Sequence, residues 1–263
     1  MNTNTWDYSK SDLIKGLKNI GLKNGDLVFI HISYGLLGRV KDGNTNEDIC
    51  KIILDSFQTV LGDSGTLLVP TYTYSFCENK IFDVNNTPSI IGPFPEFFRI
   101  QKNVIRSQDP IFSVAGLGPK ADKLLTNLSH TCFGKDSIYD RLIKHGGKIC
   151  LLGLGLQWST FRHHIEESIG IPTRFVKQFS GKILWNGKIR EETWDYYVRH
   201  LNNNCYPDGH RLEEKIKKND LYKISKIGRG EISCIDSKVY FKFGYKELQK
   251  DPWFTSKGPP INQ

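Results

Sequence analysis

Apolar residues recur with two spacings in the first half of the chain, and each spacing predicts one kind of element. Within residues 9–21, Leu13, Leu17 and Ile20 fall at helical intervals, with Ser11 or Asp12 as the N-cap and Gly21 as the stop. The same spacing predicts further helices at 46–61, 119–128 and 137–145. Short continuous apolar runs predict buried strands at 27–32, 65–72 and 148–155.

Strands that are apolar on both faces and alternate with amphipathic helices are typical of α/β proteins. From about residue 180 the pattern changes to short alternating pieces with turn residues between them. Asn186-Gly187 predicts a hairpin turn, and Asp236-Ser237 predicts a second one within 230–245. We therefore predict an α/β sandwich with a partly parallel sheet and an antiparallel C-terminal portion, in one domain over 1–263.

Composition is that of an ordinary globular protein, with 263 residues of which 38% are hydrophobic and 24% charged. No apolar stretch approaches the roughly 20 residues of a membrane span, and the N-terminus has neither the basic nor the apolar region of a signal peptide. The six cysteines include no Cys-x-x-Cys pair, so we expect free, buried thiols. These features predict a cytoplasmic protein with no membrane partner.

The formal net charge of +8 leaves three interpretations open: nucleic-acid binding, an anionic small ligand, or a basic surface alone. The densest run of cations is Arg211, Lys215, Lys217 and Lys218. Acidic residues at 213 and 214 interrupt it, as on the solvated face of a helix. Nucleic acid is therefore not expected as a partner, whereas an anionic ligand stays open.

The segment 151–175 holds the strongest candidate chemistry. A buried strand runs into glycines, and a helix is predicted from about Ser159, which places His163 and Glu166 on one face. Ligands of open α/β sheets bind past the carboxyl ends of strands. A carboxylate on one imidazole nitrogen leaves the other free to accept a proton. A plain surface pair remains an alternative.

A metal site is a further interpretation of His163, His164, Glu166 and Glu167. Neighbouring helical positions point about 100° apart, so only two of the four could face one ion. No metal is expected for that reason.

Three other segments are candidates for binding. The glycine-rich loop at 31–44 is either a backbone nest for an anion or a pantetheine arm, or a plain strand–helix loop. Aromatic and hydroxyl residues at 70–76 are a pocket wall or a core edge, and 106–116 joins an arginine to a turn of small residues. The sequence contains neither a complete Walker A motif nor a Gly-x-Ser-x-Gly elbow.

Taken in order, these segments resemble the aminoglycoside 3-N-acetyltransferase family, also called the antibiotic N-acetyltransferase family. The blocks that carry the likeness are 21–38, 62–76, 106–121, 133–155, 159–168 and 228–254. The resemblance implies an α/β/α sandwich with a mixed central sheet. It also implies acetyl-CoA or another short acyl-CoA as co-substrate, and an amino group on a sugar as acceptor.

The family's Thr-x-x-His-x-x-Glu motif falls on Thr160, His163 and Glu166. By resemblance, His163 is the base, Glu166 orients it, and Thr160 holds the intermediate or the thioester oxygen. The residues that the resemblance implies for the donor are His31, Ser33, Tyr34, Gly35 and Gly38, with Ser113 near the thioester.

One departure from the family pattern bears on the acceptor. Members that modify aminoglycosides more often have Asp-Ser-Asn-Thr where this chain has Gln157, Trp158, Ser159 and Thr160, so an acidic group is lost. A chain of net charge +8 is also a poor host for a polycation. We therefore predict a nucleotide-linked acceptor, such as a dTDP-3-amino-3,6-dideoxyhexose for surface polysaccharide (O-antigen) synthesis, and acetyl or hydroxybutanoyl-like transfer. The predicted acceptor-binding residues are Tyr72, Arg106, Trp158, Arg162 and Arg174.

Alternatives remain at this point. One is an aminoglycoside 3-N-acetyltransferase proper, which confers antibiotic resistance, and another is a non-catalytic protein that binds an anionic ligand or nucleic acid. An acyl-enzyme on Cys77, Cys132 or Cys150 is a further route, although no base lies near them in sequence. The oligomeric state stays open, with a homodimer as one option.

Overall fold

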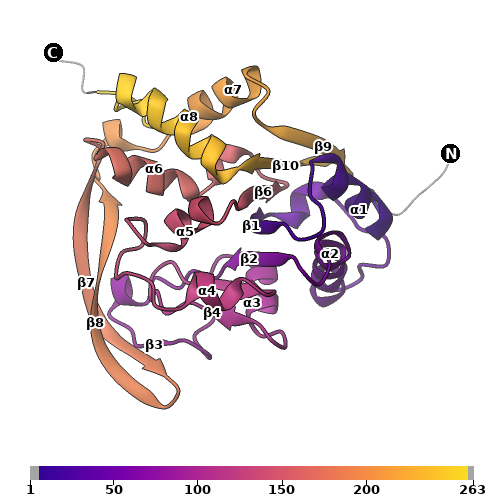
Figure 1. Ribbon diagram of the computed structural model, residues 1–263, viewed down its shortest axis with the longest axis horizontal. Helices are drawn as coiled ribbons and strands as arrows, with labels where there is room; N and C mark the ends of the chain where they lie inside the picture. The colour runs from indigo at the N-terminus through magenta and orange to yellow at the C-terminus, as the bar shows by residue number, and fades with distance from the viewer. Residues whose placement is uncertain (1–5, 260–263) are drawn as a thin grey trace.

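A seven-stranded mixed sheet forms the centre of the molecule, in the order β4-β5-β2-β1-β6-β10-β9 (Figure 1). The computed structural model describes residues 6–259. β1 pairs in parallel with β2 and β6, and the outer pairs are antiparallel. The strands are β1 (Leu27–Ile32), β2 (Thr66–Pro70), β4 (Ile105–Arg106), β5 (Val114–Leu117), β6 (Lys148–Leu152), β9 (Lys223–Ile227) and β10 (Gly230–Asp236).

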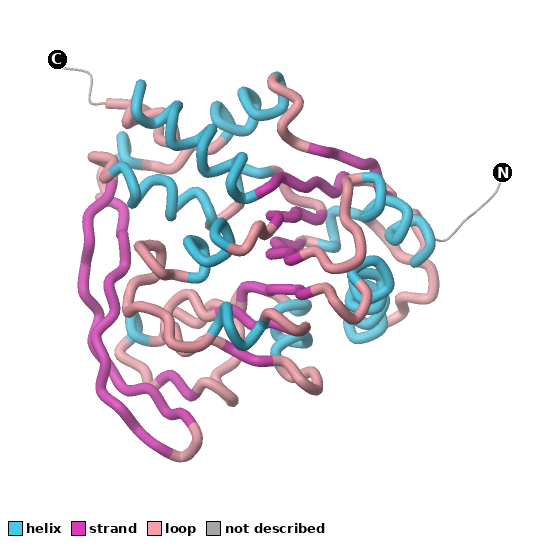
Figure 2. The backbone as a smooth tube through the Cα atoms, viewed as in Figure 1, coloured by secondary structure: helices cyan, strands magenta, loops and turns pink. Residues whose placement is uncertain are grey.

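Helices lie on both faces of the central sheet (Figure 2). The side chains of the central strands alternate between two hydrophobic cores, one on each face. Val28 and Ile30 face the core covered by α1 (Lys10–Asn19), α2 (Asn46–Leu61) and α3 (Pro93–Arg99). Leu27 and Phe29 face the other core. The helices that cover it are α4 (Ala121–Leu125), α5 (Ile138–Lys144), α6 (Phe161–Ile169), α7 (His210–Lys218) and α8 (Ser237–Lys250). The predicted α/β/α sandwich with a mixed sheet is confirmed.

A long hairpin of β7 (Arg174–Trp185) and β8 (Lys188–Arg199) joins β3 (Phe82–Asp83) in a second sheet. In Figure 1 the hairpin runs down the left side of the molecule, from the region of α6 past β3. Its turn residues Asn186 and Gly187 have φ angles of 49° and 72°, as a two-residue hairpin turn requires. The hairpin predicted at this turn is confirmed.

Two predictions of local structure are wrong, and both concern helix caps. The N-cap of α1 is Ser9, two or three residues before the predicted Ser11 or Asp12, because Ser9 forms a reciprocal capping box with Asp12. The second hairpin does not exist, because β10 ends at Asp236 and α8 follows directly. The Asp236 carboxylate accepts the backbone N–H groups of Lys238 and Val239 and so caps that helix.

The carboxyl ends of β1 and β6 meet at one edge of the sheet, because these strands are parallel neighbours. Gly153 follows β6 with a φ of +70°, and a Cβ there would lie 2.4 Å from the Ser33 carbonyl oxygen. The tight approach directs the chain through η3 (Leu156–Trp158) into α6, which carries the Thr-x-x-His-x-x-Glu motif. Within residues 6–259, no helix is both long and apolar enough to cross a membrane.

Candidate active site

His163 and Glu166 lie one turn apart on α6 and form a hydrogen-bonded pair. The distance from His163 Nδ1 to Glu166 Oε2 is 2.8 Å. The Phe133 ring packs edge-on against the imidazole at a centroid distance of 5.1 Å, which restricts its rotation. The pairing predicted from the spacing is therefore present in the structure.

Glu166 is buried in a network of cations and donors. Besides His163, it forms ion pairs with Arg162 Nε at 2.9 Å and Arg174 Nε at 2.8 Å. Thr255 Oγ1 donates a hydrogen bond to Glu166 Oε1, also at 2.8 Å. Burial alone would raise the pKa of Glu166, but Arg174 and Arg162 outweigh burial, so the pKa is lowered. The carboxylate is therefore ionised at neutral pH.

His163 is held as a neutral base. Burial, together with the charge of Arg174, lowers the pKa of His163 to about 4, although the Glu166 carboxylate acts in the opposite direction. Because Nδ1 faces a carboxylate, the proton of the neutral ring resides on Nδ1. No hydrogen bond among residues 6–259 occupies Nε2, which leaves that nitrogen free to accept a proton.

The lowered pKa gives a first testable prediction. We expect His163 to remain a neutral, Nδ1-protonated imidazole from about pH 8 to pH 5 in histidine-labelled NMR spectra. As the pH falls from the unfolded value of 6.5 toward about 4, the unfolded chain gains a proton that the folded chain lacks, so His163 lowers stability in that window. An NMR midpoint for His163 near 6.5 would contradict this assignment.

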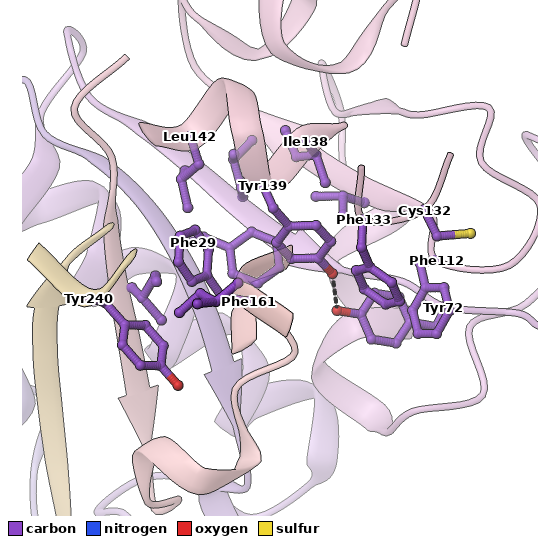
Figure 3. Close-up of a cluster of buried hydrophobic side chains, with 14 of the residues drawn as sticks. Phe29, Tyr72, Phe112, Cys132, Phe133, Ile138, Tyr139, Leu142, Phe161 and Tyr240 are labelled. Atoms are coloured by element: carbon purple, nitrogen blue, oxygen red, sulfur yellow. Dashed lines mark hydrogen bonds between the residues drawn. The ribbon is translucent and has the colours of Figure 1, made fainter. Parts of the chain in front are cut away.

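Thr160 lies at the start of the same motif, at the centre of a buried hydroxyl network. Its Oγ1 is 2.6 Å from the Tyr72 hydroxyl, 3.1 Å from the Tyr139 hydroxyl and 3.2 Å from His31 Nε2. Figure 3 shows the two tyrosine hydroxyls meeting among the buried aromatic rings, at 2.8 Å. The network fixes the position of the Thr160 side chain.

His31 is part of this network. The Thr160 N–H donates to its Nε2 at 3.3 Å, so the ring proton resides on Nδ1. Burial and the neighbouring His163 lower the pKa of His31 to about 3. His31 is therefore neutral and positions Thr160.

A pocket of about 400 Å³ opens beside His163. Its lining residues are Gln157, Trp158, Ser159, Thr160, Arg162, His163, Arg174, Arg199, Tyr206, Pro207 and Gly209. Three of the five predicted acceptor-binding residues, Trp158, Arg162 and Arg174, are among them. A fourth, Tyr72, is buried behind the pocket, where its hydroxyl contacts Thr160.

Arg106, the fifth predicted acceptor-binding residue, is not among the residues that line this pocket. The side chain is buried, and its guanidinium donates to the backbone carbonyls of Thr71 at 2.7 Å, Thr87 at 2.6 Å and Val84 at 3.2 Å. Its Nε also donates to Ser113 Oγ at 3.2 Å. Arg106 therefore joins β2 to the loop around β3.

Replacement of Arg106 tests this structural role. Arg106→Gln leaves several buried carbonyl groups without a donor, so we expect a loss of ~3 kcal/mol in the free energy of unfolding. Thermal denaturation should show a Tm lower by roughly 5–10 °C, with an unchanged KM for the acceptor. Arg39 is exposed, so Arg39→Gln is the control and should change neither the Tm nor the KM for the acceptor. An increase in acceptor KM for Arg106→Gln without loss of Tm would restore the sequence-based assignment.

The residues predicted for the donor are not gathered at this pocket. Ser33, Tyr34 and Gly35 belong to the turn around η1 (Tyr34–Leu37), which packs beside Gly153. None of them lines the pocket. Tyr34 donates to Asn46 Oδ1 at 2.9 Å.

Gly38 and Ser113, which were also predicted to bind the donor, make contacts within the fold. A Cβ on Gly38 would lie 2.4 Å from the Asp7 carboxylate, so this position needs glycine. Ser113 is fully buried and donates to the Thr71 carbonyl at 2.6 Å. The donor assignment of these residues thus remains a prediction from resemblance.

The cysteines are free thiols, as predicted. Burial raises the pKa of Cys77 to about 11 and raises those of Cys132 and Cys150 well above the usual range. A thiol needs a lowered pKa to act as a nucleophile at neutral pH, so this environment disfavours an acyl-enzyme. In the described part of the chain, no group of three or more His, Cys, Asp or Glu could hold a metal ion.

Several residues of the site were not predicted from the sequence. Arg199 lines the pocket from the base of the hairpin, and Tyr206, Pro207 and Gly209 line it from the segment that follows. Thr255 reaches Glu166 from the C-terminal segment. Only Arg199 had a signal in the sequence, through the register of the predicted hairpin.

A neutral imidazole that is held by a buried carboxylate and lines a pocket is suited to an enzyme that removes a proton from a bound substrate. The family of that enzyme follows from comparison with known proteins. A family model described as aminoglycoside 3-N-acetyltransferase matches residues 29–249, and the chain belongs to this family. It is therefore an N-acyltransferase, as predicted, and the alternative of a non-catalytic binding protein is set aside.

Individual relatives agree with this assignment. Aminoglycoside N(3)-acetyltransferase IX of Micromonospora chalcea is 29% identical over 201 residues, covering 68% of this chain and 69% of the relative. Aminoglycoside N(3)-acetyltransferase IV of Salmonella sp is 25% identical over 250 residues, covering 94% and 90%. The structure of AAC-IIIb in a binary complex with CoASH matches with a TM-score of 0.78 at 22% identity, covering 96% of this chain and 99% of that one. The last match shows the fold.

Proposed function

We propose that this protein transfers a short acyl group from acyl-CoA to an amino group of an amino sugar, with His163 as the general base. The observation that carries the proposal is the hydrogen-bonded pair of His163 and Glu166, at 2.8 Å. His163 lines the pocket, and its Nε2 has no hydrogen bond within residues 6–259. A neutral imidazole with an available nitrogen can take a proton from an attacking amine.

The proposed reaction is a direct transfer between two bound substrates. The amine nitrogen attacks the thioester carbonyl carbon while His163 Nε2 takes the amine proton. The tetrahedral intermediate then expels the CoA thiolate, which recovers that proton from the imidazolium, and the products are an amide and free CoA. Glu166 stabilises the transient imidazolium. Thr160, positioned by Tyr72 and Tyr139, donates its hydroxyl to the developing oxyanion.

Acyl-CoA as the donor is supported by family membership and by the fold shared with AAC-IIIb, which was solved with CoASH. The acyl group is proposed to be acetyl or a similarly short chain. No metal takes part in the proposed steps, which need only a base, its orienting carboxylate and an oxyanion donor.

An aminoglycoside is the acceptor that the comparisons favour over the nucleotide-linked sugar predicted from the sequence. Both curated relatives are named as aminoglycoside N(3)-acetyltransferases, and the matching family model carries the same description. Under this candidate the chain would modify an aminoglycoside antibiotic.

A nucleotide-linked amino sugar is the second candidate, and one observation favours it. Arg162, Arg174 and Arg199 line the pocket beside His163, while none of its lining residues is an aspartate or glutamate. Such a wall repels a polycation and attracts a phosphate-bearing ligand.

Release of free thiol from acetyl-CoA, and in parallel from 3-hydroxybutanoyl-CoA, tests the proposal. A dTDP-linked 3-amino-3,6-dideoxyhexose and an aminoglycoside such as sisomicin serve as the two acceptors. Turnover with either acceptor supports the chemistry, and the preferred one identifies the acceptor class. Thiol release at the background rate with both acceptors and both donors would refute the proposed function.

A further inference from the structure

Two arginines face each other across the base of the hairpin. The register of β7 and β8 places Arg174 directly opposite Arg199, and both side chains line the pocket. Like charges that are directly opposed in an antiparallel pair destabilise a sheet. An anion bound between them would remove this cost.

The charge of one of these arginines is compensated and that of the other is not. Arg174 pairs with Glu166 at 2.8 Å and donates to the Tyr197 carbonyl at 3.1 Å. Arg199 donates only to the backbone carbonyl of the next residue, His200, at 3.3 Å. Among residues 6–259, no carboxylate lies within 4.0 Å of its guanidinium. Arg199 therefore presents an uncompensated cation to the pocket.

Two exposed aromatic side chains lie at the same pocket. Trp158 is 64% exposed and Tyr206 is 53% exposed, and both belong to its lining. Arg199 and Lys257 lie over the Tyr206 ring at 5.4 Å and 5.1 Å. Because cations already lie over the Tyr206 ring, the exposed Trp158 ring is the one suited to stacking a nucleobase next to its phosphates.

We propose that Arg199 binds the diphosphate of a nucleoside-diphosphate-linked amino sugar, whose base stacks on Trp158. The inference rests on the proposed function, because the sugar amine must reach His163 on the wall of the same pocket. A nucleoside diphosphate is also part of CoA, but in CoA a long pantetheine arm separates it from the thioester. The pocket beside His163 has a volume of about 400 Å³, which lies within the range of small-molecule sites.

Arg199→Gln tests this inference, with Lys182→Gln as the matched control. Lys182 is an exposed cation on the same hairpin and lies outside the pocket. For Arg199→Gln we expect the KM of the dTDP-linked amino sugar to rise ~10–100-fold, while kcat and the KM of acetyl-CoA stay within about twofold of wild type. Removal of one charge from the opposed arginine pair should leave Tm equal or higher. Lys182→Gln should behave as wild type throughout.

Calorimetric titration with dTDP alone separates this inference from the proposed function. Weaker dTDP binding by the same factor in Arg199→Gln supports the inference even if no acceptor were acylated. Equal dTDP affinity in wild type and Arg199→Gln would overturn it, even with acyl transfer intact. A rise confined to the KM of acetyl-CoA would overturn it as well, because the arginine would then serve the donor. A lower KM for sisomicin in Arg199→Gln would overturn it too, because the positive charge of Arg199 would then only repel a cationic acceptor.

Discussion

His163→Asn is expected to lower kcat for acyl transfer by ~10²–10⁴-fold, because it removes the nitrogen that accepts the amine proton. Asparagine retains a polar amide of smaller size in the place of the imidazole, so the helix and the pocket should keep their structure. Thiol release at saturating acyl-CoA and acceptor measures the loss, and circular dichroism confirms the fold.

His145→Asn is the matched control for that variant. His145 ends α5, at the amino end of β6 and away from the pocket. Its replacement should leave kcat unchanged. If His163→Asn turned over at the wild-type rate, His163 would not be the base, and the proposed proton transfer would have to start from another group.

Glu166→Gln is expected to produce the largest loss of stability, about 3–5 kcal/mol in the free energy of unfolding. The substitution leaves the buried cations Arg162 and Arg174 without their shared carboxylate. It also replaces the charged acceptor that fixes the proton of His163 on Nδ1 with a neutral amide. The midpoint of urea denaturation should therefore be lower in Glu166→Gln than in wild type. The kcat for acyl transfer should also be lower.

Glu167→Gln, at the next position, is the control for this prediction. Burial and the nearby Asp195 raise the pKa of Glu167 to about 7, so this side chain is partly protonated at neutral pH. Its only hydrogen bond in the described residues comes from Thr131 Oγ1, at 3.5 Å. A neutral amide imitates the protonated acid, so the midpoint should stay the same or rise. An equal loss of unfolding free energy in Glu166→Gln and Glu167→Gln would argue against a stabilising role for the ion pairs of Glu166.

Local rules predicted most of the fold and the centre of the site. The spacing of His163 and Glu166 on a helix gave a hydrogen-bonded pair, because three residues bring side chains onto one face. The Asn186-Gly187 turn also determines the hairpin register. Counting outward from its Trp185–Lys188 pair leads to Arg174 opposite Arg199, so this contact was available from the sequence.

Other features depend on contacts between distant segments, which periodicity does not reveal. Thr255 reaches Glu166 across 89 positions of sequence, and Thr160 meets His31 across 129. Arg106 resembled a ligand-binding cation in the sequence, but folding surrounds it with carbonyl groups from 71–87. The Asp236 turn was misassigned because a β-turn and a helix N-cap favour the same residue type.

The most direct test of the central claim is the fate of an isotope-labelled acyl group. Wild-type protein is incubated with [¹³C]acetyl-CoA and a mixture of the dTDP-linked amino sugar and sisomicin, and the products are analysed by mass spectrometry and NMR. We expect the label to appear in an amide on the nitrogen of an amino sugar, and His163→Asn to form this amide at a rate ~10²–10⁴-fold lower. Labelled amide formed equally fast by wild type and His163→Asn, or label found only as acetate, would contradict the central claim.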